Sequence, residues 1–260
     1  MGSSAVQGAL WGASAPEWAE LVEPAQSPFY EAAFDALGVG PGMHMLDAGC
    51  GSGLALVLAA KRGATPTGLD AADGLLHVAR ERLPDADLCQ GDLEDLPYDD
   101  DTFDAVTAFN SVQYATDPTN ALREIRRVAK PGALVAVATW GTPEQCEMRV
   151  VLQAIGNLLP PPPPGAGGPF ALSAPGALEA LVEQAGLQAE RSIDVPTPYT
   201  YPGIDVAIRA QMSSGPARRA IEHAGADALR MALSSAFTDC RVSDGTVHLD
   251  NIFRVMIARA

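Results

Sequence analysis

Apolar and polar positions alternate with two different periods along most of the chain. From residue 43 onward, short apolar runs of strand length are followed by stretches in which apolar residues recur at helical spacing. This alternation predicts a mostly parallel sheet with helices on both faces. The expected strands are 43–48, a run ending at 70, 86–90, 105–110, 134–138, 188–195 and 252–258. The expected helices are 54–62, 72–83, 117–130, 143–158 and 175–185.

Local signals mark the ends of several of these elements. Asp117 is placed to cap the helix that follows it, and Pro118 suits the first turn of that helix. Gly63 and Gly186 are expected to stop two other helices. Pro66 fits its strand less well, because proline cannot donate a ladder hydrogen bond, and the first residue of the strand would suit it better.

The two ends of the chain have a different pattern. Residues 5–40 carry apolar positions at helical spacing, which predicts one or two helices with a loop around 24–28. These helices either pack on the sheet or cap a ligand, with Trp11 or Tyr30 in contact. Residues 160–169 are rich in proline and glycine and are expected to form an extended surface connector, or else a wall of the acceptor site. Residues 198–240 are interpreted as a helical insertion.

A glycine-rich turn follows the first strand, with the sequence Asp47-Ala48-Gly49-Cys50-Gly51-Ser52-Gly53. Glycine at alternate positions lets the backbone turn sharply and approach a ligand at a helix N-terminus. A dinucleotide fingerprint would need a third small residue three places after its second glycine. Leu54 and Leu56 occupy the two possible positions, so the turn favours a different nucleotide-type ligand.

The pattern D-x-G-x-G-x-G resembles motif I of the class I S-adenosylmethionine-dependent methyltransferases, and the resemblance continues in order downstream. Four further motifs lie within residues 43–140: 67–70, 90–93, 96–106 and 122–132. The chain therefore resembles bacterial small-molecule methyltransferases of the type 11 kind. The resemblance implies a Rossmann-like α/β fold with seven strands in the order 3-2-1-4-5-7-6, the seventh antiparallel. It also implies one domain, with an N-terminal helical cap (1–42), a cofactor-binding core (43–140) and an acceptor-side half (141–260) that includes a lid at about 198–240.

The resemblance also assigns the cofactor, S-adenosylmethionine, and its contacts. Asp47 and the glycine turn are implied to hold the methionine end, Asp70 the ribose, and Asp92 the adenine. Asn110 ends the fourth strand, where the family's backbone faces the methionine amino group. Asp47 and Asp92 could instead be capping or turn acids. The predicted cofactor-binding residues are Asp47, Gly49, Cys50, Gly51, Asp70, Ala71, Asp92, Leu93 and Asn110.

The acceptor side is less defined. Many members of the family carry a histidine just after the fourth strand, whereas this chain has Ser111-Val112-Gln113-Tyr114. Glutamine cannot act as a base, so no catalytic residue is assigned. Gln113, Tyr114 and Trp140 are predicted to contact the acceptor, although each could equally serve packing. The remaining aromatic and histidine candidates are Tyr199, Tyr201, His44, His77, His223 and His248.

Composition narrows the class of partner. The net charge of -15 and the pI near 4.5 weigh against a nucleic-acid acceptor, which needs a basic face. The spacing of the 4 cysteines matches neither a metal site nor a redox pair, so we expect no metal and reduced thiols in a cytoplasmic protein. No apolar run approaches the ~20 residues that cross a bilayer, so no membrane span is expected.

These observations predict a methyltransferase that acts on a small, largely apolar metabolite, of quinone or secondary-metabolite type, and releases S-adenosylhomocysteine. An alternative is a protein of the same fold that binds the cofactor to catalyse a cyclisation or rearrangement, or to sense it. A nicotinamide-dependent dehydrogenase is disfavoured because Leu54 and Leu56 stand where its fingerprint would need a small residue. The chain also lacks a Tyr-x-x-x-Lys pair. The sequence does not define the acceptor, the methylated atom or the oligomeric state.

Overall fold

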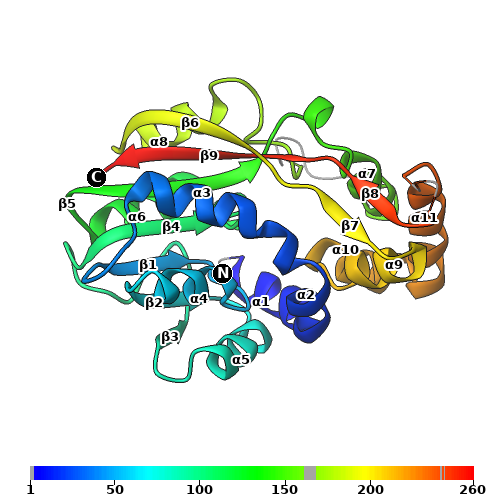
Figure 1. Cartoon of the computed structure of the whole chain (residues 1–260), viewed down its shortest axis with the longest axis horizontal. Helices are drawn as coiled ribbons and strands as arrows, with labels where there is room; N and C mark the ends of the chain where they lie inside the picture. The colour runs from blue at the N-terminus through cyan, green and yellow to red at the C-terminus, as the bar shows by residue number, and fades with distance from the viewer. Residues whose placement is uncertain (1–2, 161–167, 241, 243) are drawn as a thin grey trace.

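The central element of the protein is a sheet of seven strands in the order β3-β2-β1-β4-β5-β9-β6 (Figure 1). The structure is a computed structural model and describes residues 3–160, 168–240, 242 and 244–260. Neighbouring strands from β3 to β5 are parallel, whereas β9 runs antiparallel to both β5 and β6. This arrangement confirms the predicted order, with β9 as the seventh strand. The strands are β1 (His44–Ala48), β2 (Thr65–Asp70), β3 (Asp87–Gln90), β4 (Phe103–Phe109), β5 (Ala129–Trp140), β6 (Gln188–Pro196) and β9 (Ile252–Arg259).

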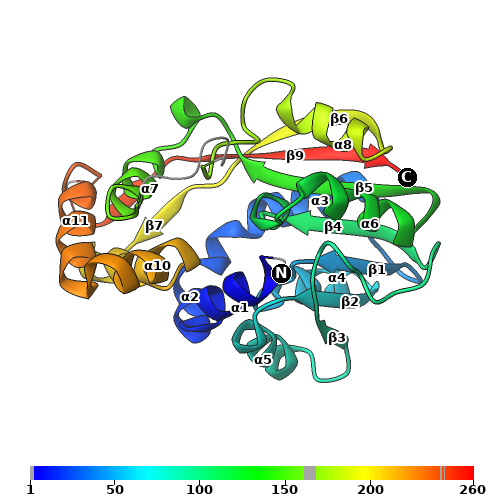
Figure 2. The ribbon, with the colours of Figure 1, turned by 180° about the vertical axis from the view of Figure 1, so that it is seen from behind.

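Helices cover both faces of the sheet, so its central strands are apolar on both sides. In β1, Met45 and Leu46 point to opposite faces, and both are fully buried in separate core clusters. The helices α3 (Ser27–Leu37) and α4 (Leu54–Lys61) pack on one face. The opposite face carries α6 (Pro118–Val128) and α8 (Ala177–Gln184), which lie in front of the sheet in Figure 2.

Two local features of this core have simple causes. Asp117 Oδ1 accepts a hydrogen bond from the Asn120 amide at 3.1 Å, which confirms the predicted cap of α6. Pro66 is the second residue of β2, not its first. The amides that face β1 alternate along β2, beginning with Thr65, which donates to the Met43 carbonyl. The Pro66 nitrogen therefore faces β3, whose pairing with β2 begins at Thr67, so the missing donor costs no ladder bond.

The N-terminal segment contains more helix than the sequence predicted. It forms α1 (Ser4–Gly12), α2 (Ala15–Leu21), the 3-10 helix η1 (Glu23–Gln26) and then α3. The predicted loop at 24–28 is wrong, because Pro24 and Pro28 each lie in the first turn of a helix, where the missing amide would have no intrahelical partner. Helix α5 (Asp73–Arg82) packs against both α1 and α2.

The C-terminal half also departs from prediction in two places. The expected helix over 143–158 is interrupted: η3 (Pro143–Gln145) ends at Cys146, which is extended, and α7 (Arg149–Gly156) follows. Part of the predicted helical insertion is strand, because β7 (Tyr199–Tyr201) pairs antiparallel with β8 (Val247–Leu249). The predicted connector at 160–169 falls largely outside the described residues.

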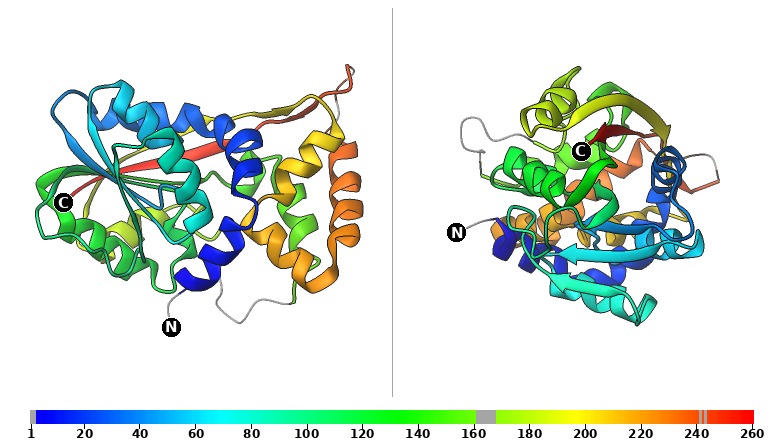
Figure 3. Two further views of the ribbon diagram at one scale, coloured as in Figure 1. Left: turned by 90° about the horizontal axis from the view of Figure 1, so that it is seen from below. Right: turned by 90° about the vertical axis from the view of Figure 1, so that its left-hand side faces the viewer.

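A helical group lies at the end of the ribbon that β6 and β7 form with β8 and β9 (Figure 3). It comprises α7, α9 (Ile204–Met212), α10 (Gly215–Ala224) and α11 (Ala226–Thr238), and it contacts α1 and α2 through α10 and α9. The predicted lid role of this group stays a prediction. Within the described residues, no helix has the length and apolar character needed to span a bilayer.

Candidate functional site

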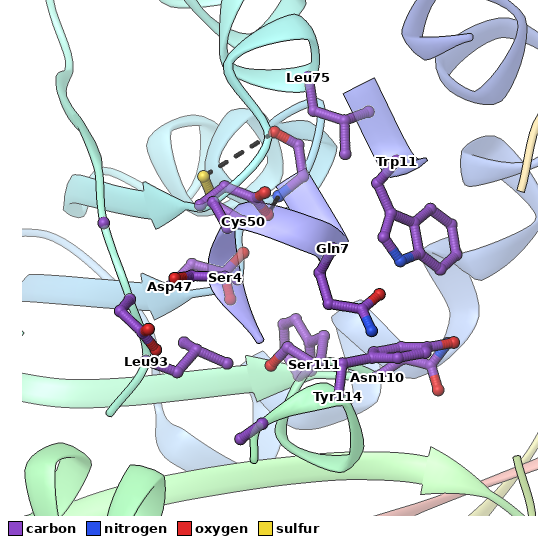
Figure 4. A pocket seen from close by; sticks show the side chains of 18 of the residues that line it. Ser4, Gln7, Trp11, Asp47, Cys50, Leu75, Leu93, Asn110, Ser111 and Tyr114 are labelled. Atoms are coloured by element: carbon purple, nitrogen blue, oxygen red, sulfur yellow. Dashed lines mark hydrogen bonds between the residues drawn. The ribbon is translucent and has the colours of Figure 1, made fainter. Parts of the chain in front are cut away.

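A cavity lies at the carboxyl ends of the central strands, beneath the N-terminal helices (Figure 4). One wall is formed by the glycine turn after β1, the end of β2 and the residues that follow β3 and β4. The other wall comes from α1 and from residues between 18 and 30. Ligands of open α/β sheets bind at this edge, where the strand order reverses between β1 and β4.

The glycine turn is shaped for close approach. Gly49 has a φ of 87°, and its amide donates to the Leu69 carbonyl at 2.7 Å. A Cβ at Gly49 would lie 2.4 Å from the Ser111 Cβ. Gly51 also has a positive φ, 54°, but a Cβ there would meet no described atom within 4 Å. The turn therefore leaves open space beside Gly51, as a backbone cradle for a ligand requires.

Asp70 is fixed at the end of β2 by two backbone donors. Its Oδ2 accepts from the Gly51 amide and its Oδ1 from the Ala72 amide, both at 2.8 Å. Burial raises the pKa of this carboxyl, and these amides oppose the rise. Each oxygen keeps a further lone pair, so the carboxylate can still accept from two ribose hydroxyls. Ala71 lies beside it in the cavity wall.

Asp47 is the most deeply buried acid of the wall, with 1% of its surface exposed. Burial raises the pKa of Asp47 to about 7, and nearby Asp70 and Glu23 add to the rise, whereas a 2.7 Å hydrogen bond from Thr107 Oγ1 opposes it. Cys50 also lines the cavity, and burial raises the pKa of its thiol well above the usual value. The thiol is therefore a packing group and not a nucleophile.

Asp92 and Leu93 line the end of the cavity beyond β3. Asp92 Oδ1 accepts a hydrogen bond from the Glu94 amide at 3.0 Å, so the residue does stabilise a turn. Its second carboxylate oxygen is not used in that bond and remains free to accept from a ligand. The predicted contact with adenine stays a prediction.

Of the residues after β4, some line the cavity and one holds a lining side chain in place. Asn110 lines the cavity with a φ of 53°, which is unusual for a residue other than glycine. Gln113 is outside the lining and donates to Asn110 Oδ1, so it holds that side chain in place. Tyr114 lines the cavity, where Gln7 of α1 points toward it (Figure 4), and burial raises its pKa to about 12.

The structure does not bring Trp140 to this cavity. The residue is 6% exposed, and its ring packs on Phe253 with ring centroids 4.3 Å apart. Tyr199 and Tyr201 are buried in the same core cluster. The four histidines also lie outside the cavity lining.

The N-terminal helices close the cavity through specific contacts. Ser3 donates from its hydroxyl to the Tyr114 carbonyl at 2.7 Å and from its amide to Thr116 Oγ1 at 3.0 Å. Gly8 of α1 lies so close to the Ala71 carbonyl that a Cβ would be 2.4 Å from its oxygen. Trp11 packs edge-on against both Trp18 and Tyr114, at 4.8 and 5.5 Å between ring centroids.

Sequence reasoning missed two polar residues of this wall. Glu23 of η1 accepts from the Leu54 amide at 3.3 Å and forms an ion pair with Arg82. Gln26 accepts from Tyr30 Oη at 2.6 Å and donates to Tyr199 Oη at 3.3 Å. No local signal distinguishes them from the other polar residues of this segment, such as Glu20 and Glu31, and their partners are distant in sequence.

The charge of the cavity is one-sided. Among the described lining residues, Glu23, Asp47, Asp70 and Asp92 are acidic, and none is basic. A cofactor with ribose hydroxyls and a net positive charge fits this wall. Its hydroxyls can donate hydrogen bonds to Asp70, and its positive charge offsets the buried carboxylates.

The known proteins that this chain is similar to include methyltransferases. Residues 46–137 match the family described as "Methyltransferase domain". A demethylmenaquinone methyltransferase from Renibacterium salmoninarum is 38% identical over 117 residues, which cover 45% of this chain and 49% of that protein. The chain spans about half the length of the curated relatives that it matches.

Solved structures share the fold over a longer stretch. A proposed methyltransferase from Bacillus halodurans has a TM-score of 0.60 at 17% identity, covering 88% of this chain and 97% of that one. A (4+2)-cyclase has a TM-score of 0.59 at 21% identity, covering 89% and 80%. At these identities the similarity shows the fold alone.

Proposed function

Because the chain carries a class I S-adenosylmethionine-dependent methyltransferase domain, we propose that it transfers the methyl group of this cofactor to a small, largely apolar acceptor. The observation that supports this most strongly is the convergence of the open glycine turn, Asp70 and Asp47 on one cavity. Asp70 would hold the ribose, Asp92 and Leu93 the adenine, and Asp47 with the turn the methionine end.

When bound, the cofactor supplies an electrophilic methyl on a positively charged sulfur. The acceptor would exchange a proton for this methyl group, and the carbon–sulfur electron pair would stay on the leaving thioether. The leaving thioether needs no protonation. The protein therefore contributes mainly position and the exclusion of water.

The residues of this chain suit that task. Trp11, Trp18, Tyr30, Phe109 and Tyr114 form the aromatic part of the cavity wall, so they can exclude water from the reacting groups. Their rings offer a surface for a flat or apolar acceptor. One relative is named for a quinone precursor, demethylmenaquinone, which supports an acceptor of quinone or secondary-metabolite type.

Two further properties belong to the same proposal. The acidic cavity and the net charge of -15 favour a small molecule over a nucleic acid as acceptor. All four cysteines are free thiols, which supports a cytoplasmic location.

Incubation with methyl-labelled cofactor and a panel of quinols, phenols and other apolar metabolites tests the proposal. We expect label to appear on at least one acceptor, in an amount equal to that of the S-adenosylhomocysteine formed. The Asp70→Ala variant, assayed in parallel, should lose the transfer. An active acceptor whose methylation is unaffected by Asp70→Ala would contradict the assigned site.

The alternative is a reaction on the same fold that keeps the cofactor intact. A neighbour with the same fold is named as a (4+2)-cyclase, so the fold alone does not distinguish such a reaction from methyl transfer. If a bound metabolite is converted without label transfer and without S-adenosylhomocysteine, this alternative replaces methyl transfer. A labelled product formed in equal amount with S-adenosylhomocysteine excludes it.

A further inference from the structure

We propose that Glu23, a residue of the N-terminal helices, determines the specificity of the cavity for the positively charged cofactor over its neutral product. The inference rests on the proposed function for the identity of that cofactor. S-adenosylmethionine carries a carboxylate, an ammonium and a sulfonium, and so has a net charge of +1. S-adenosylhomocysteine lacks the sulfonium charge and is neutral overall.

Glu23 is built into the site and is not a surface acid. Its side chain is 3% exposed, and its residue lines the cavity together with Asp47 and the glycine turn. The carboxylate accepts from the Leu54 amide, the first residue of α4, and pairs with Arg82 at the end of α5. It therefore places the acidic partner of an ion pair from the N-terminal helices against the turn that lines the cavity.

Arg82 holds this arrangement but does not neutralise the cavity. Its guanidinium also donates to the carbonyls of Ser52 and Ala19, at 2.9 and 3.0 Å. Arg82 is outside the cavity lining and forms its ion pair with Glu23 alone among the four acids of that lining. Burial raises the pKa of Glu23, and Arg82 opposes that rise, whereas Asp47, whose pKa burial also raises, has a hydroxyl partner and, among the described residues, no cation.

A ligand with an extra positive charge offsets these carboxylates, whereas a neutral ligand of the same shape does not. Transfer of the methyl group removes the positive charge from the sulfur. The attraction to the carboxylates is then lost, and this favours release of the product. A unit charge at a partly buried site changes such a preference by about tenfold.

Two substitutions separate this electrostatic role from a structural one. Glu23→Gln and Arg82→Gln break the same ion pair, so a purely structural role predicts similar effects on both ligands. They change the charge in opposite directions. We expect Glu23→Gln to lower the ratio of the S-adenosylhomocysteine Kd to the S-adenosylmethionine Kd by about tenfold, and Arg82→Gln to raise it.

Calorimetric titration of each variant with S-adenosylmethionine, sinefungin and S-adenosylhomocysteine measures these ratios. Sinefungin carries an amine in place of the methylated sulfur, so it should follow S-adenosylmethionine. Ratios that stay unchanged, or that move in the same direction in both variants, would overturn the inference while leaving the cofactor assignment intact. Failure of the unmodified protein to bind either adenosyl compound would remove the proposed function as well. If Glu23→Gln does not fold, the direction of the change in Arg82→Gln still decides the matter.

Discussion

At the scale of single residues, ligand binding in the cavity depends on a few carboxylates with different surroundings. Asp70 is held by two backbone amides and keeps lone pairs for a ligand, whereas Asp47 is buried beside other acids. The first was predictable from its position at the end of a strand. The raised pKa of the second was not, because it depends on Thr107 and Glu23, which only the fold brings close.

Replacing Asp70 by alanine should weaken binding of S-adenosylmethionine about 100-fold. The change removes two hydrogen bonds from ligand hydroxyls to a charged group, each contributing at least about 1.5 kcal/mol, so about 100-fold is the lower bound. Calorimetry on the purified variant measures the loss. Asp73→Ala is the matched control, because Asp73 is a nearby acid that is paired with Arg80 and lies outside the cavity lining. Equal affinities in the two variants would refute the role of Asp70.

Asp47 should make the ligand-free protein less stable as pH rises. Its pKa is raised from 3.8 to about 7 in the folded state, so between these values the folded protein binds more protons than the unfolded chain. Stability due to this group is therefore full below about pH 4 and falls by a few kcal/mol as pH rises through 7.

Urea unfolding at pH 5 and pH 8 tests this dependence. The Asp47→Asn variant should lose less stability between the two pH values than the unmodified protein. Asp73→Asn, which changes an exposed acid, should behave like the unmodified protein. An Asp47→Asn variant with an undiminished pH dependence would show that another group is responsible.

At the scale of elements, the N-terminal helices complete the site that the sheet begins. Helix α1 is fastened at one end by Ser3 and in its middle by Gly8, which lies against the Ala71 carbonyl. A β-carbon at Gly8 would have to displace backbone, and a flexible side chain could not relieve the contact. We therefore expect Gly8→Val to undock α1.

Undocking should appear as faster proteolysis within residues 3–22 and as weaker cofactor binding, by roughly tenfold or more, with the sheet still folded by circular dichroism. Val6→Ile serves as the control, because it enlarges a side chain of α1 that is 58% exposed. If Gly8→Val leaves both proteolysis and affinity at the level of the control, α1 does not close the cavity in solution.

The elements also show where sequence patterns are informative. Most strands and helices between 43 and 140 were predicted to within two residues, because Met45 and Leu46 belong to an apolar run and Asp117 caps its own helix. The exception is β5, which begins at Ala129, five residues before its predicted start. The strand β7 was missed, since three residues that pair only with distant β8 carry no local signal. Pro24 and Pro28 were interpreted as loop residues, although proline is equally suited to the first turn of a helix.

At the scale of the whole molecule, the fold brings distant segments to one cavity. Glu23 pairs with Arg82, which is 59 residues away in sequence, and accepts from Leu54, 31 residues away. Motif spacing therefore predicts the half of the site built by the sheet. For the half built by the N-terminal helices, the sequence offered a cap with Trp11 or Tyr30 in contact, and both residues line the cavity. It could not decide between this cap and packing on the sheet, and it did not identify Glu23, because both depend on packing between distant segments.

The central claim is that this cavity binds S-adenosylmethionine, and parallel calorimetric titration with S-adenosylmethionine, S-adenosylhomocysteine and NADH tests it most directly. We predict that both adenosyl compounds bind with a stoichiometry of about one and compete with each other, because both fit the turn, Asp70 and Asp92. NADH should give no response, since Leu54 fills a position that a dinucleotide fingerprint reserves for a small residue. Binding of NADH alone, or of none of the three, would contradict the account.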